Sequence, residues 1–91
     1  MKLFTPWKKY RKSHGSYERR EILNSPARGY YTGEMHFVSR NSYGRYETSI
    51  NFAMPFFSAK DAMDAVDTYL RNQGYTLFDT EEQMKKFMAL I

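Results

Sequence analysis

Two histidines, His14 and His36, are the side chains of this chain whose ordinary pKa lies nearest neutrality, so they are its natural general bases. Neither lies in a nucleophile elbow, a glycine-rich phosphate loop or a zinc-binding spacing. A serine, a histidine and a carboxylate can meet from any part of a chain, so the sequence leaves a triad open. The absence of a motif favours two surface histidines, no catalytic residues and no enzyme activity.

Three aspartates recur at every third position, at Asp61, Asp64 and Asp67. Carboxylate oxygens are ligands of magnesium and calcium, so a metal site is one interpretation. On a helix, however, this spacing spreads the aspartates along one flank, and Lys60 and Arg71 stand four residues from Asp64 and Asp67. The pattern therefore predicts a solvated helix face, with no metal and no cofactor.

Positive charge is concentrated in the first half of the chain. Residues 1–46 contain ten Lys or Arg and three Glu, whereas residues 47–91 contain four basic and seven acidic residues. Trp7, Tyr10 and Tyr17 lie among these cations. Cations beside aromatic rings are typical of nucleic-acid binding, although Trp7 and Tyr10 would also suit anchors to the core. The residues predicted to bind a partner are the principal cations Lys8, Lys9, Arg11, Lys12, Arg19 and Arg20, together with Trp7, Tyr10, Arg28, Arg40, Tyr43 and Arg45.

The length and composition indicate one small domain. A chain of 91 residues has room for a single domain, expected over residues 1–91, with residues 1–16 as a possible flexible basic arm. The absence of cysteine excludes disulfides and thiolate chemistry and fits the cytoplasm. The longest apolar run is far shorter than a membrane span, and the N-terminus lacks the apolar core of a signal peptide. We therefore expect a cytoplasmic protein that does not insert into a membrane.

Alternation of apolar and polar residues over residues 29–54 predicts a central β-hairpin. A four-residue loop that pairs Arg40 with Arg45 places Met35 and Phe37 on the buried face of the hairpin. The opposite, exposed face would then carry Tyr30, Thr32, Glu34, His36, Val38 and Arg40.

Helical spacing behind a capping residue predicts amphipathic helices that begin near Ser58 and Thr80. Short strands are expected over residues 17–23 and 75–78, and Thr5, which is followed by proline, could start a short N-terminal helix. The predicted order is (α)-β-β-β-α-β-α. It corresponds to an α+β fold in which the two amphipathic helices cover one face of a small, mostly antiparallel sheet.

The element order α-β-β-β-α over about residues 5–73 resembles the double-stranded-RNA-binding domain. That family contacts phosphates through a Lys-Lys-x-x-x-Lys run at the start of its last helix. In this chain the corresponding residues 58–64 contain one lysine and two aspartates, and a further strand and helix are predicted after residue 74. The resemblance is one of order alone, so no binding residue is assigned from it.

In size, layout and lack of cysteine the chain is also similar to small phage-encoded inhibitors, including anti-CRISPR proteins. This resemblance implies a protein that acts by covering a surface of a larger complex. We therefore expect a non-enzymatic binding protein that occludes an acidic or phosphate-bearing surface on a nucleic-acid-handling or defence complex. The acidic second half would repel a duplex, which favours a protein partner. Direct binding of DNA or RNA by the basic, aromatic-interleaved N-terminal half is the alternative.

Overall fold

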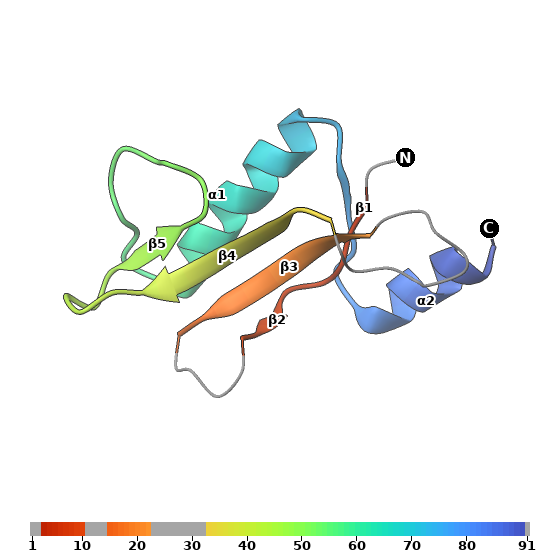
Figure 1. Cartoon of the computed structure of the whole chain (residues 1–91), viewed down its shortest axis with the longest axis horizontal. Helices are drawn as coiled ribbons and strands as arrows, with labels where there is room; N and C mark the ends of the chain where they lie inside the picture. The colour runs from red at the N-terminus through yellow and green to blue at the C-terminus, as the bar shows by residue number, and fades with distance from the viewer. Residues whose placement is uncertain (1–2, 11–14, 23–32, 91) are drawn as a thin grey trace.

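A mixed sheet with two helices forms the protein, and the computed structural model describes residues 3–10, 15–22 and 33–90 of it (Figure 1). The sheet has the strand order β5-β4-β3-β1-β6, with β2 beside β3. Only the β1–β6 pair is parallel among the strand pairs of the described residues. The predicted α+β class is therefore confirmed. The elements are β1 (Leu3–Phe4), β2 (Lys8–Lys9), β3 (Tyr17–Ile22), β4 (Met35–Arg40), β5 (Tyr46–Thr48), α1 (Ala59–Asn72), β6 (Thr76–Leu77) and α2 (Glu81–Ala89).

Both predicted helix starts are confirmed. The Ser58 hydroxyl accepts the Asp61 N–H at 3.1 Å, and the Thr80 hydroxyl accepts the Gln83 N–H at 3.1 Å. Each hydroxyl thus satisfies a backbone donor that the first helical turn leaves unpaired. In the part of the chain that the structure describes, neither helix is long and apolar enough to cross a bilayer.

Residues 3–10 contain the short strands β1 and β2 and no helix, so the predicted N-terminal helix is wrong. β1 lies between β3 and β6, and β2 pairs with β3 so that Lys8 is opposite Glu18. The Thr5 hydroxyl, which we expected to cap a helix, accepts the Arg20 N–H at 3.0 Å. An isolated short helix is unstable in water, so pairing with a longer strand outweighs it. The predicted flexible arm is built into the sheet at residues 3–10, and the element order that resembled the double-stranded-RNA-binding domain is lost with the helix.

The β4–β5 hairpin is shifted by one residue from the predicted register, because Arg40 pairs with Tyr46 instead of Arg45. The Gly44 N–H donates to the Asn41 carbonyl at 3.1 Å, and Gly44 then adopts a left-handed φ of 76°. A tight turn followed by a left-handed glycine is typical of three-residue hairpin loops with a bulge. The loop is therefore one residue shorter than we predicted, and a one-residue shift exchanges the two faces of a strand.

As a result, the side chains of β4 face the opposite way from the prediction. Val38 and His36, expected on the exposed face, are 0% and 6% exposed, whereas Met35 and Phe37 are 37% and 39% exposed. Two large apolar side chains thus point away from the core, and a histidine points into it.

The two helices pack against opposite faces of the sheet, whereas we predicted both on one face. Phe4 belongs to a core cluster with Val66 and Leu70 of α1, and its neighbour Leu3 belongs to a second cluster with Met84 of α2. Successive side chains of a strand point to opposite faces, so these clusters lie on the two sides of the sheet. Figure 1 shows α1 along β4 and α2 beyond the β1 end of the sheet.

The packing of α1 can be tested at Leu70, which is 1% exposed. Leu70→Ala leaves a cavity in the core, so we expect it to lower the free energy of unfolding by about 2–5 kcal/mol in urea denaturation. Leu90, which is 84% exposed, is the matched control, and Leu90→Ala should change stability by about 0.5 kcal/mol or less. Equal effects of the two variants would contradict this placement of α1.

Candidate functional site

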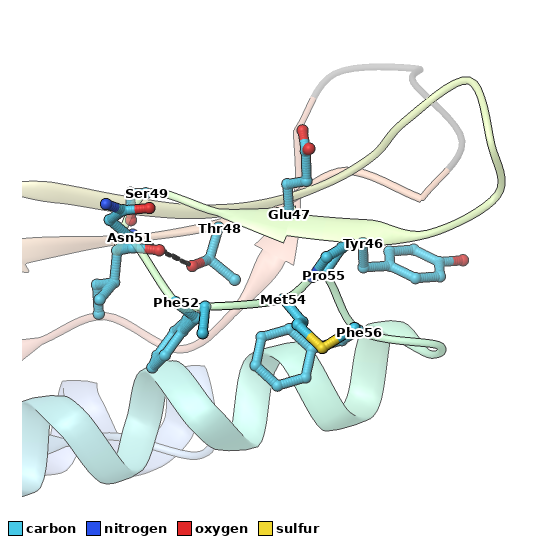
Figure 2. A pocket seen from close by; sticks show the side chains of 11 residues that line it. Tyr46, Glu47, Thr48, Ser49, Asn51, Phe52, Met54, Pro55 and Phe56 are labelled. Atoms are coloured by element: carbon cyan, nitrogen blue, oxygen red, sulfur yellow. Dashed lines mark hydrogen bonds between the residues drawn. The ribbon is translucent and has the colours of Figure 1, made fainter.

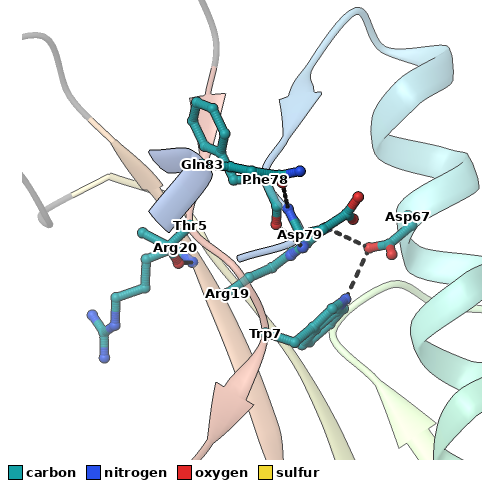
Figure 3. A network of polar contacts seen from close by, with 8 residues as sticks. All are labelled: Thr5, Trp7, Arg19, Arg20, Asp67, Phe78, Asp79 and Gln83. Carbon is teal, nitrogen blue, oxygen red and sulfur yellow. Dashed lines mark hydrogen bonds and ion pairs between the residues drawn. The ribbon is translucent and has the colours of Figure 1, made fainter. Parts of the chain in front are cut away.

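Arg19, one of the principal predicted cations, lies inside the protein. Its side chain is 2% exposed, Nη1 donates to Asp67 Oδ1 at 2.7 Å, and Nη2 donates to the Phe78 carbonyl at 2.9 Å (Figure 3). The Trp7 indole N–H donates to the same Asp67 oxygen at 3.0 Å, and the guanidinium lies 5.1 Å from the centre of the Trp7 ring. Arg19 therefore does not belong to an exposed binding surface. Of the two roles that the sequence allowed for Trp7, the structure shows the anchor of the N-terminal segment to the core.

Burial opposes charge on both members of this ion pair. Desolvation raises the pKa of Asp67 although Arg19 and Trp7 favour its carboxylate, and desolvation lowers the pKa of Arg19 although Asp67 favours its cation. Removing one partner would leave the other charge buried without a counter-charge. From the sequence we assigned Asp67 to a solvated flank beside Arg71, because helical spacing does not show a partner from a distant strand.

The role of this pair can be tested by comparing two variants. Arg19→Met is expected to lower the free energy of unfolding by about 3–5 kcal/mol, because Asp67 loses its counter-charge. The control is Lys60→Met, which breaks the exposed Lys60–Asp64 pair at 2.8 Å and should not change stability measurably. Urea denaturation gives both values, and a stability of Arg19→Met equal to that of Lys60→Met would contradict a structural role for Arg19.

The other predicted cations are distributed over different sides of the molecule. Lys8 and Lys9 are successive strand residues at the β2 edge, so they point to opposite faces. Arg20 points away from the buried network in Figure 3, and Arg40 and Arg45 lie at either end of the β4–β5 turn. The continuous cationic area that we predicted is therefore not formed by the residues that the structure describes. Arg11, Lys12 and Arg28 lie outside those residues, as do His14, Tyr30 and Thr32.

Two of these cations approach carboxylates of the chain itself. Arg20 Nη2 lies 3.2 Å from Glu18 Oε2, and Lys8 Nζ lies 4.0 Å from Glu81 Oε1. Such pairs reduce the net positive potential that a phosphate backbone would meet.

Large apolar side chains lie on the face of the sheet opposite α1. Tyr10, Met35 and Phe37, each between 37% and 39% exposed, line a shallow groove across β2, β3 and β4. The small residues Ser16 and Ser39 line the same groove. The register places charged residues beside these side chains, because Phe37 pairs with Glu18, Glu18 pairs with Lys8, and Met35 pairs with Arg20. We call this surface the open face, and it consists of Lys8, Tyr10, Glu18, Arg20, Met35 and Phe37.

A second exposed group lies at the β4–β5 turn. Tyr43 is 85% exposed and Phe57 is 76% exposed. The guanidinium carbon of Arg45 lies 4.4 Å from the centre of the Phe57 ring, which is the geometry of a cation–π contact. We call Arg40, Tyr43, Arg45 and Phe57 the turn anchor. Three of its members were predicted as site residues, whereas Phe57 was missed because the pairing of its segment with β5 was not predicted.

His36, predicted as a surface histidine, is buried and lies between the side chains of Ser49 and Glu34. Nδ1 lies 2.8 Å from Ser49 Oγ, and Nε2 lies 2.9 Å from Glu34 Oε1 without the alignment of a hydrogen bond. A hydrolase triad has the same three group types, but its serine meets Nε2. Ser49 Oγ also accepts the Phe37 N–H at 3.2 Å, so it closes the end of the β4–β5 pairing. These contacts favour a structural link.

The segment 46–56 surrounds a hollow of about 400 Å³ (Figure 2). Phe52 and Phe56 point from this segment toward α1, and their rings contact each other with centres 5.4 Å apart. The polar side chains of Glu47 and Asn51 lie apart along the loop in Figure 2. A ligand site needs polar groups that converge, so this hollow is the inside of a loop and not a candidate site. Within the described ranges, no three potential metal ligands lie together.

Comparison of the chain with protein-family models, curated proteins and solved structures found no match. The function is therefore inferred from the chain's own residues.

Proposed function

We propose that the chain is a non-enzymatic binding protein that covers a surface of a larger protein partner with its open face. One observation supports this proposal above the others: Tyr10, Met35 and Phe37 are more than one-third exposed on a sheet whose other face is packed by α1. Contiguous apolar side chains on the surface of a small domain mark interaction sites. Their removal from water on docking contributes about 25 cal/mol for each Å² that is buried.

The charges around the open face favour a protein over a nucleic acid. Arg20 is paired with Glu18, and Lys8 approaches Glu81, so positive and negative groups alternate there. A phosphate backbone is bound by cations that displace counterions, whereas a protein interface combines an apolar centre with a mixed polar rim. Acidic groups of the partner would meet the β2 edge, where Lys8 and Lys9 are both exposed.

The class of partner that we propose is a cytoplasmic complex that handles nucleic acid or serves in defence, with an acidic or phosphate-bearing docking surface. The resemblance to small phage-encoded inhibitors, including anti-CRISPR proteins, supports this class by size and layout. Such an inhibitor needs an exposed face that is complementary to its target and no chemistry of its own.

The proposal predicts that Phe37→Glu prevents complex formation. A charged side chain in the centre of the apolar contact would be desolvated without a partner. Phe37 is partly exposed but lies opposite Glu18, so we expect the variant to lose about 1–2 kcal/mol of stability, and circular dichroism checks that the fold is retained. The measurement is purification of the tagged chain from its native cells after nuclease treatment, with quantification of the proteins that co-purify.

Tyr69→Glu on α1 is the matched control, since Tyr69 is 42% exposed on the other side of the sheet, and it should retain the complex. A complex that Phe37→Glu retains, or that both variants lose equally, would show that the open face is not the binding surface.

A nucleic acid is the second candidate, because the aromatic residues Tyr10 and Phe37 lie near Lys8 and Arg20. Single strands bind to such combinations by stacking and by phosphate contacts. This candidate requires that the purified chain bind generic single-stranded oligonucleotides with an affinity that falls steeply as salt rises. We expect no such binding at physiological salt, and a Phe37-dependent affinity there would replace the protein proposal.

A further inference from the structure

We propose that the turn anchor inserts Tyr43 into an apolar pocket of the same protein partner, while Arg45 and Arg40 pair with acidic side chains around that pocket. This inference rests on the proposed function, because it assigns a second contact to the partner of the open face.

The turn is held in one conformation before any partner binds. Asn41 Oδ1 accepts the N–H groups of Tyr43 at 2.9 Å and of Arg45 at 3.0 Å. The Asn41 N–H donates to the Arg45 carbonyl at 2.7 Å, and the Gly44 N–H donates to the Asn41 carbonyl at 3.1 Å. A backbone that is already ordered loses little conformational entropy on docking. Tyr43 is thus presented on a preorganised support.

The side chains of the turn anchor are those that dominate protein interfaces. Tyrosine and arginine are enriched among the residues whose truncation weakens binding most. Tyr43 is 85% exposed, so nearly its whole ring can be buried by a partner. The Phe57 ring holds the planar Arg45 guanidinium, which leaves the edge of that group able to meet a carboxylate in a bidentate pair.

Charge identifies the surface that receives the turn anchor. Arg19 and Arg20 each have a carboxylate within 4.0 Å, but no carboxylate of the described ranges lies within this distance of Arg40 or Arg45. These two positive groups lie at the ends of a single turn beside an apolar ring. A surface that is complementary to them has an apolar recess bordered by aspartate or glutamate.

Site-specific photo-crosslinking in the native cells tests this inference. A benzophenone-bearing phenylalanine analogue replaces Tyr43, Phe37 or Tyr69, one position at a time in the full chain. We expect positions 43 and 37 to crosslink to one and the same protein, and position 69 to give no crosslink to it. The partner peptide joined to position 43 should contain more Asp and Glu than Lys and Arg.

Charge reversal distinguishes the turn anchor from a passive neighbour. Arg45→Glu should lower the crosslinking yield at position 43 by about tenfold or more, because it places like charges together in the contact. Lys85→Glu, the same charge change on the exposed side of α2, should leave the yield unchanged. Circular dichroism of both variants shows whether the fold is retained.

Each other outcome overturns a defined part of the account. Crosslinking at position 37 without crosslinking at position 43 overturns the turn anchor and retains the proposed function. Crosslinking at neither position overturns both. A nucleotide or a basic peptide joined to position 43, or a yield that Arg45→Glu leaves unchanged, overturns the acidic pocket.

Discussion

The buried contact between Arg19 and Asp67 fixes which side of β3 faces α1 and which side stays exposed. Arg19 Nη1, from the middle of β3, lies 2.7 Å from Asp67 Oδ1 on α1. The Trp7 indole N–H donates to the same oxygen and thereby fixes the N-terminal segment to α1. Because neighbouring strand residues point to opposite faces, an inward Arg19 requires that Arg20 lie on the other side. Arg19, which we predicted in an exposed binding surface, therefore serves inside the protein to orient β3 against α1.

The open face and the turn anchor are connected through a single strand. β4 carries Met35 and Phe37 on the open face and continues into the turn that presents Tyr43. In the proposed complex, a partner that binds the open face would find the turn anchor at the end of the same strand. In protein interfaces, a few aromatic and arginine contacts supply most of the binding free energy. The surrounding charges contribute to specificity and to the rate of association.

The sequence predicted the features of this fold that depend on neighbours within a few residues. The caps at Ser58 and Thr80 are local, because each hydroxyl bonds the N–H three residues later. The features that it missed depend on distant partners or on one backbone angle. Thr5 looked like a helix cap until β3 supplied a partner, and the left-handed Gly44 shortened the predicted loop by one residue. That single residue exchanged the two faces of β4, so Phe37 could not be assigned to the surface from alternation alone.

The central claim is that, along β4, the face with Met35 is open and the face with Val38 is covered by α1. Nuclear magnetic resonance of the full chain with a soluble paramagnetic agent measures this directly, because the agent broadens the signals of methyl groups that it can approach. We predict strong broadening of the Met35 methyl signal, since Met35 is 37% exposed, and sharp signals from Val38, which is 0% exposed. Broadened Val38 signals beside a protected Met35 methyl would contradict the account.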